Sequence, residues 1–328
     1  MPAGAETAQS AVRMGVAFIL AGMTAISIND MAIKTLSAGY ALHQIVFVRS
    51  LFGLCFNLVF LQFEGGFAAL RTAHPWLHAL RGVMIVAANM AFFAALAVIP
   101  LAETTALFFV APLFITLLSV PVLGERVGSR RLGAVLVGFL GVLVMLRPWG
   151  GLGGDVSRWV LLLPVGAALC YAVMQVLTRW LGVSSRASAM AIYLQATFLA
   201  VSVVFWAVAG DGRYVDAVTH ESLQFLLRAW TWPAAEDWPF FLLIGAMSAI
   251  VSYSLGAAYR SADAAVIAPF EYVALPLAIF WGFVVFGEVP GPWVLAAIAL
   301  IAGAGLYVFL RERARDRPPS ARRVGLRR

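Results

Sequence analysis

The chain has 328 residues, of which 62% are hydrophobic and only 12% are charged. A soluble domain carries about 25% charged residues, so this composition excludes water as the solvent for most of the surface. The formal net charge is +7, and a basic tail lies at 311–328. No set of aromatic residues for base stacking and no folded nucleic-acid-binding domain accompanies this tail, which argues against nucleic acid as a partner. We expect instead a membrane protein whose tail lies against anionic lipid headgroups.

Charged residues divide the sequence into apolar runs of membrane-spanning length. Lipid offers no hydrogen-bond partners to the backbone, and the runs lack the period-two alternation of barrel strands, so each run is predicted to be a transmembrane helix. Only the fifth run is short. In chain order the predicted helices lie within 14–34, 41–62, 81–103, 103–125, 131–147, 158–179, 186–211, 237–260, 263–288 and 288–311.

The distribution of the 23 basic residues predicts the orientation of these helices. With ten helices both termini share one side, and most arginines fall on that side. The opposite side holds only five basic residues, which are Lys34, Arg147, Arg158, Arg213 and Arg228. Because basic loops stay in the cytoplasm, we predict a multi-pass protein of a bacterial-type inner (plasma) membrane with both termini cytoplasmic.

An internal repeat relates the two halves of the chain. Two segments share an acidic residue near the helix start, a mid-helix proline (Pro112 and Pro276), and a terminal Gly-Glu pair that ends at Glu125 and Glu288. Five helices separate the pairs, and an odd number makes the second copy inverted. Inverted repeats are typical of alternating-access carriers. The predicted organisation is an N-tail at 1–13, a first repeat at 14–150, a second at 151–310 and a basic tail at 311–328.

The sequence resembles the drug/metabolite transporter superfamily, and specifically its ten-helix EamA-type members. The resemblance covers about residues 14–310. It rests on the repeated proline helix with its Gly-Glu end, on Arg49 in Phe47-Val-Arg49, and on Phe270-Glu271-Tyr272. It implies a carrier of small organic solutes, often an exporter of amino acids, and the aromatic amino-acid exporter is similar in layout. Other members resemble importers of S-adenosylmethionine or riboflavin.

Three charges fall inside predicted helices, where a charge is costly and needs a partner or a wet cavity. Asp30 and Arg49 lie at similar depth on neighbouring helices, so we predict that they pair. The pair either only fixes packing, or Arg49 exchanges Asp30 for a substrate carboxylate, which its planar fork binds well.

Glu271 is the third intramembrane charge, about eight residues into the ninth predicted helix. A carboxyl group in a low dielectric is expected to be largely protonated. The residue is therefore a candidate for proton coupling or for binding a substrate ammonium group. The alternative is a protonated side chain that hydrogen-bonds to a neighbouring helix.

Polar and aromatic residues scattered at mid-depth complete the predicted site. Each alone packs helices together, whereas together they resemble an apolar cavity with a few polar points, suited to a modest amphipathic solute. Pro112 and Pro276 lie at matching depths and are either gating points or static kinks. The substrate-binding candidates are Asn29, Asp30, Arg49, Asn89, Phe93, Phe108, Tyr171, Gln175, Tyr253, Tyr272 and Trp281.

Several functions are not supported by any motif. The sequence has no phosphate-binding loop, nucleophile elbow or His/Cys cluster, so we expect no enzyme activity, no cofactor and no metal. The four histidines are expected to be solvated near helix ends. The main hypothesis is a secondary exporter of aromatic or other apolar amino acids, and the alternative is an importer of a nucleoside- or vitamin-like solute. An integral membrane enzyme or a channel is more remote. Besides the solute, the expected partners are lipids, and the chain is a monomer or homodimer.

Overall fold

The computed structural model describes residues 3–63, 66–72, 74–124, 128–146, 158–181, 187–261 and 268–315. All regular structure in these residues is helical, as the composition predicts. In these residues eight helical spans are long and apolar enough to cross a membrane, two of which, Leu101–Val122 and Pro269–Phe286, contain the breaks described below. Two shorter apolar helices, Leu132–Leu146 and Pro292–Val308, bring the total to the predicted ten. The protein is therefore an all-α, multi-pass membrane protein.

The bounds of the elements follow the predicted order of helices. The first half contains α1 (Ala3–Leu36), α2 (Leu42–Phe63), η1 (Gly66–Leu70), α3 (Pro75–Leu96), α4 (Leu101–Phe108), α5 (Ala111–Leu123) and α6 (Ser129–Leu146). The second half contains α7 (Arg158–Leu181), α8 (Ala187–Ala209), η2 (Val215–Ala217), α9 (Glu221–Leu227), α10 (Trp238–Ser261), η3 (Ala268–Val273), α12 (Ala274–Phe286) and α13 (Pro292–Arg315).

The packing of these helices confirms the inverted repeat. In the repeat, α1, α2, α3 and α6 correspond to α7, α8, α10 and α13. The contact of α1 with α10 therefore has its equivalent in the contact of α7 with α3, and the contact of α2 with α10 has its equivalent in that of α8 with α3. The pairs α2–α8 and α6–α13 each join a helix to its own counterpart in the other half. Arg81 near the start of α3 hydrogen-bonds to Thr178 near the end of α7, so α7 runs opposite to α3. Lys34 near the end of α1 donates to the carbonyl of Ile99, just after the end of α3, so α1 runs in the same direction as α3 and opposite to its counterpart α7. The two halves thus have opposite directions in one bundle.

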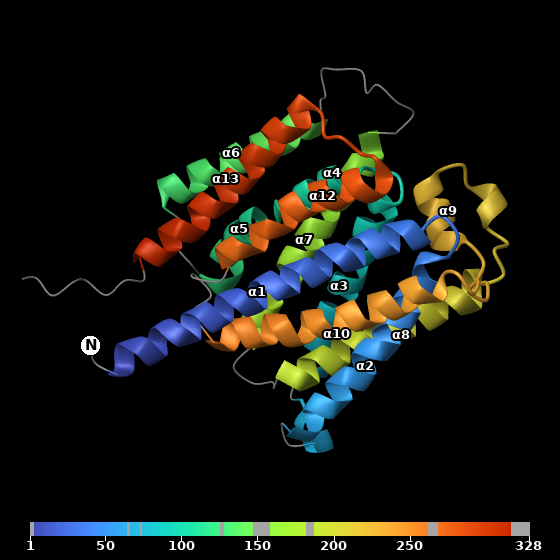
Figure 1. The fold of residues 1–328 in the computed structure, drawn as a ribbon, viewed down its shortest axis with the longest axis horizontal. Helices are drawn as coiled ribbons and strands as arrows, with labels where there is room; N and C mark the ends of the chain where they lie inside the picture. Colours follow the sequence, from blue (N-terminus) through green and yellow to red (C-terminus); the bar gives the residue numbers. More distant parts are fainter. Residues whose placement is uncertain are drawn as a thin grey trace, which may run out of the picture.

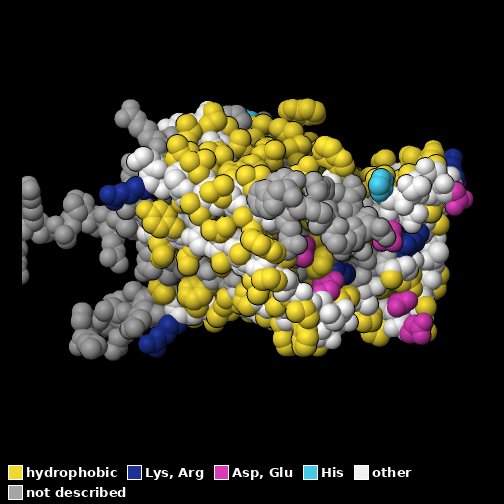
Figure 2. All heavy atoms as spheres, turned by 90° about the horizontal axis from the view of Figure 1, so that it is seen from above, with side chains coloured by type: hydrophobic (Ala, Val, Ile, Leu, Met, Phe, Trp, Pro, Cys, Tyr) yellow, Lys and Arg dark blue, Asp and Glu magenta, His cyan; other side chains and the backbone are white. Residues whose placement is uncertain are grey.

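The two ends of the bundle carry different structures. Helix α1 begins and α13 ends at the same end, which we call the terminal side, and α9 lies at the other end, which we call the α9 side (Figure 1). Hydrophobic side chains cover much of the visible surface between them, and most of the visible charged side chains lie at the two ends, with a few near the middle (Figure 2). This is the distribution expected of a bundle that spans a membrane.

The broken fourth and ninth spans correct the prediction of continuous helices with a mid-helix proline. The fourth span ends as α4 at Phe108 and resumes as α5, which has Pro112 in its first turn. The described part of the ninth consists of η3 followed by α12, whose third residue is Pro276. Proline is disfavoured inside a helix and favoured in its first turn, because it has no N–H to donate. Each proline therefore marks the start of a new helix.

The helices that follow these breaks match in the two halves. Both α5 and α12 have 13 residues, and they end at Gly124 and Gly287 with φ of 70° and 67°. Glycine adopts this left-handed conformation without steric cost. The Gly-Glu marks of the sequence are therefore two equivalent helix ends, although Glu125 itself lies outside the described residues.

Four further sequence predictions need correction or fall outside the structure. Helix α1 begins at Ala3, so most of the predicted N-tail continues the first helix. His43 and His78 are buried, not solvated, because they lie where α2 and α3 pack against other elements. The repeat boundary at 150–151 and the tail from 316 lie outside the described residues.

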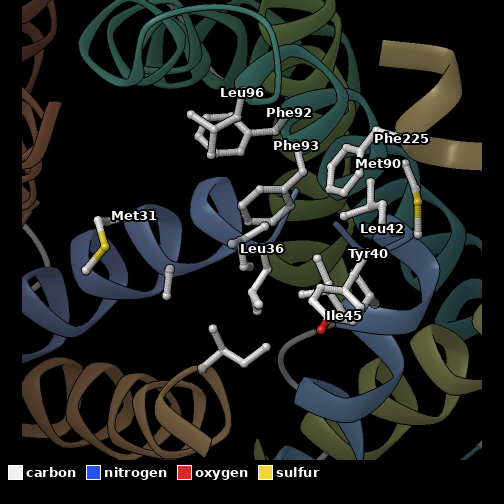
Figure 3. Close-up of a cluster of buried hydrophobic side chains, with 14 of the residues drawn as sticks. Met31, Leu36, Tyr40, Leu42, Ile45, Met90, Phe92, Phe93, Leu96 and Phe225 are labelled. Atoms are coloured by element: carbon white, nitrogen blue, oxygen red, sulfur yellow. The ribbon is translucent and has the colours of Figure 1, made fainter. Parts of the chain in front are cut away.

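A core of apolar side chains joins the α9 ends of the first three helices to the second half. Figure 3 shows Leu36, Leu42 and Ile45 beside Phe93 and Leu96, with Phe225 of α9 against the same group. The core closes the bundle on this side and holds the helix ends that position the site described next.

Candidate functional site

Arg49 is held in the centre of the bundle by a neutral side chain, not by an acid. Its Nη2 donates to Asn89 Oδ1 of α3 at 3.2 Å, and Asp30 accepts from Asn29 Nδ2 at 3.4 Å. Among the described residues no ion pair within 4.0 Å joins Asp30 to Arg49, although their charges still attract each other. The predicted ion pair is therefore wrong in this conformation, and both side chains keep partial exposure at a depth of about two turns.

Two aromatic rings flank the Arg49 guanidinium. Its Cζ lies 5.8 Å from the ring centre of Phe93 on α3 and 5.4 Å from that of Phe198 on α8. Cation–π contact with both rings compensates part of the cost of burying the charge. Phe93 was predicted from the sequence, whereas Phe198 was missed because nothing in the pattern of the seventh span separates it from other apolar residues.

A row of aromatic rings extends from this arginine toward α7. Phe93 touches Phe92 with ring centres 5.2 Å apart, Phe92 touches Phe108 at 5.3 Å, and Phe108 touches Tyr171 at 5.4 Å. Gln175 Nε2 then donates to Tyr171 Oη at 2.8 Å. Four predicted residues, Phe93, Phe108, Tyr171 and Gln175, thus lie in one row that joins α3, α4 and α7.

Asn29 and Trp281 lie at the same level on the adjacent helices α1 and α12. The Lys34 amine is 5.1 Å from the Phe286 ring centre, and both helices run toward the α9 side. Five residues back along each helix, Asn29 and Trp281 therefore both lie about 8 Å deeper. Asn29 Oδ1 and Trp281 Nε1 are buried without a hydrogen-bond partner. Such groups are uncommon in native structures and suit a site that binds a polar ligand.

The remaining predicted residues lie toward the terminal side. Glu271 and Tyr272 are partly exposed on η3, and the ring of Tyr272 lies 5.0 Å from that of Phe109. Glu271 acts electrostatically on both Tyr171 and Tyr272, which connects η3 to the aromatic row. Tyr253 of α10 is 44% exposed, and its ring meets that of Phe18 on α1 edge-on at 5.8 Å.

An ion pair that the sequence did not predict closes the α9 side. Lys34 Nζ at the end of α1 lies 2.6 Å from Glu288 Oε1 and donates to the carbonyl oxygen of Ile99 at 2.8 Å. Glu288 Oε2 accepts from the backbone N–H of Leu101 at 2.8 Å. One pair thus joins the ends of α1 and α12 to the start of α4. We call these four residues the α9-side closure.

The segment 210–237 covers the same side and is hydrogen-bonded to the turn between α1 and α2 and to the first turn of α2. Tyr40 Oη donates to Asp237 Oδ2 at 2.5 Å, and Gln44 Nε2 donates to the carbonyl of Thr231 at 2.6 Å. Arg228 Nη1 donates to the carbonyl of Ser37 at 2.8 Å. This segment contains the short helix α9, and these hydrogen bonds fix it to the first half.

An inverted repeat whose broken helices surround a polar and aromatic centre, with contacts closing one end, is the architecture of a membrane transporter. The chain belongs to the EamA-like transporter family, which matches residues 13–147. This confirms the superfamily that the sequence resembles.

Curated relatives extend the similarity over most of the chain. A riboflavin transporter of Rhizobium johnstonii is 32% identical over 82% of this chain and 81% of its own. An S-adenosylmethionine uptake transporter of Rickettsia prowazekii is 24% identical over 91% of this chain and 93% of its own. A solved crystal structure matches with a TM-score of 0.61 at 21% identity, over 94% of this chain and 99% of that one, and supports the fold alone.

Proposed function

We propose that this protein imports a riboflavin-like vitamin, a planar heteroaromatic solute, by alternating access. The observation that carries the proposal is the 32% identity to a riboflavin transporter over 82% of the chain. Riboflavin transporters of Brucella anthropi and Vibrio cholerae are also similar, at 30% and 28% identity. This favours the importer alternative of the sequence analysis over amino-acid export.

The chemistry of the centre is compatible with such a solute. The row from Phe93 to Tyr171 offers ring faces for stacking, and aromatic pairs contribute about 0.5–1.5 kcal/mol beyond area burial. Asn29 Oδ1 offers an acceptor and Trp281 Nε1 a donor, which complement a ring edge that carries N–H and C=O groups. A free amino acid has less ring surface and needs charged partners at both its ends.

S-Adenosylmethionine is the second candidate, because four uptake transporters for it are similar to this chain, at 23–24% identity. Its adenine ring would stack as a flavin does, and its sulfonium and ammonium groups would need carboxylates. Asp30 and Glu271 are both partly exposed and are the available groups.

Solute uptake tests the proposal directly. The full chain is expressed in a riboflavin-auxotrophic bacterium that lacks its own uptake system, and uptake of labelled riboflavin, S-adenosylmethionine and phenylalanine is measured. We expect saturable riboflavin uptake that unlabelled phenylalanine does not compete. Saturable transport of only S-adenosylmethionine would favour the second candidate, and transport of only phenylalanine would overturn both.

The distribution of arginines supports placing the terminal side in the cytoplasm of a bacterial-type cell. In that orientation the α9-side closure seals the outer face. Labelling intact cells with a membrane-impermeant maleimide tests this orientation. A cysteine at Thr219 on the α9 side should react, and one at Arg71 on the terminal side should not. The reverse pattern would invert the topology.

A further inference from the structure

A second arginine, Arg81, is buried, although the sequence places it at the very start of the third predicted helix, 81–103. It lies about two turns inside α3 from the terminal side, and only 5% of its surface is exposed. Its Nε donates to Thr178 Oγ1 of α7 at 2.6 Å. The Thr178 hydroxyl in turn donates to the carbonyl of Met174 at 2.7 Å. The threonine therefore orients the guanidinium but does not neutralise it.

The charge of Arg81 is uncompensated in the part of the chain that the structure describes. Its Nη1 is buried with no hydrogen-bond partner, and no ion pair or ring contact of the described residues includes it. Removing a charge from water without a counter-charge costs several kcal/mol. A guanidinium whose Nε is fixed presents its remaining N–H groups as a planar fork, the geometry that phosphate and carboxylate oxygens accept.

The position of Arg81 relates it to the central site. Asn89, which holds Arg49, lies eight residues further along the same helix, or about 12 Å. Helices α3 and α7, which Arg81 and Thr178 join, also carry Phe92, Phe93 and Tyr171 of the aromatic row. Arg81 thus lies between the same two helices as the row, displaced toward the terminal side.

We propose that Arg81 is the binding residue of a subsite for a phosphate-type anion on the terminal side of the central site, with Thr178 as its positioning residue. The anion is either a free phosphate or phosphomonoester that enters from the terminal side, or the phosphate of a lipid headgroup. The subsite does not depend on which solute the protein carries.

Thermal unfolding of the full-length protein tests the subsite. In a neutral detergent at constant ionic strength, inorganic phosphate should raise the unfolding midpoint saturably, by about 2–4 °C. Arg81→Gln should abolish the shift, and Thr178→Val should weaken phosphate binding about tenfold. Arg71→Gln is the matched control, because Arg71 is an exposed arginine on the same side, and it should keep the full shift.

A lipid arm separates the two sources of the anion. In nanodiscs, an Arg81-dependent rise that needs phosphatidylglycerol and is not produced by inorganic phosphate identifies a headgroup. A rise with inorganic phosphate in phosphatidylcholine identifies a free anion. No Arg81-dependent shift in either arm overturns the proposal.

A second variant guards against a simple folding defect. Arg81→Met removes an uncompensated charge, so without phosphate its midpoint should equal or exceed that of the unsubstituted protein. A lower midpoint would mean that the structure already satisfies Arg81, and would also overturn the proposal. These measurements do not use transport, so their failure is distinguishable from failure of the proposed import of riboflavin.

Discussion

Lys34 at the end of α1 and Glu288 after α12 form an ion pair at 2.6 Å across the seam between the two halves. Their side chains are only 11% and 21% exposed, so water screens the pair less than it screens a surface pair. Because Glu288 also accepts the N–H of Leu101, opening this side requires three helix ends to separate together. The pair is thus placed to hold the α9 side closed.

Lys34→Met should therefore favour the state that is open on the α9 side. Losing one partner of a partly buried pair costs about 1–3 kcal/mol, and that energy shifts the balance of the two states. Labelling of a cysteine at Asn29 by an impermeant maleimide, with Cys55 and Cys170 replaced by alanine, should become about tenfold faster. An unchanged rate would mean that the apolar core alone holds this side closed.

A matched control comes from the exposed pair Arg213–Asp211. Its atoms are 3.6 Å apart and the side chains are 54% and 62% exposed, and such pairs contribute about 0–1 kcal/mol. Arg213→Met should leave labelling within about twofold. Glu288→Gln should have an intermediate effect, because an amide oxygen still accepts the N–H of Leu101.

The fold was predictable from the sequence because its determinants, the length of the apolar runs and the internal repeat, extend over many residues and support one another. Apolar length defined the ten spans, and the repeated Gly-Glu ends defined the inversion. The breaks before Pro112 and Pro276 were not predicted, since a proline within an apolar run is compatible with a kink, a break or a new helix start. Neighbouring helices decide among these, and the sequence does not show them.

The site was predictable in its members but not in its contacts. Asn89 and Arg49 were both candidates, yet their depth along the helices suggested Asp30 as the partner of Arg49. This prediction failed because depth along a helix does not show which helix faces meet. Lys34 and Glu288 are far apart in sequence and were noted only as a helix flank and a repeat mark. Arg81 was counted as a flanking charge, since burial beside α7 depends on the packing of the two halves.

Gly305 allows α13 to approach η3, and replacing it should disturb the site. A Cβ at Gly305 would lie 1.6 Å from Tyr272 Oη, whereas one at Gly303 would have nothing within 4 Å. Overpacking costs about 1–3 kcal/mol, so Gly305→Ala should lower the unfolding midpoint and reduce uptake as Tyr272 is displaced. Gly303→Ala should match the unsubstituted protein in both measurements. Equal behaviour of the two variants would show that Tyr272 tilts away freely.

Glu271→Gln tests proton coupling. If protons accompany the solute inward, uptake by the unsubstituted protein rises as the outside pH falls below the inside pH. Glutamine keeps the shape and hydrogen-bonding capacity of a protonated carboxyl group but cannot release a proton, so uptake by the variant should no longer vary with pH. Asp216→Asn, which changes an exposed carboxylate, should retain the pH profile. A variant with unaltered pH-dependence would remove Glu271 from the coupling mechanism.

Arg49→Lys should reduce uptake about tenfold or more while leaving the amount of protein in the membrane unchanged. Lysine keeps the charge and reaches Asn89, but it lacks the planar fork that lies against Phe93 and Phe198 and binds acceptors at two points. A tenfold loss corresponds to about 1.4 kcal/mol, the scale of one such interaction. Arg71→Lys at an exposed position should transport normally. Normal uptake by Arg49→Lys would mean that a positive charge suffices there and that Arg49 has no role in orienting the solute.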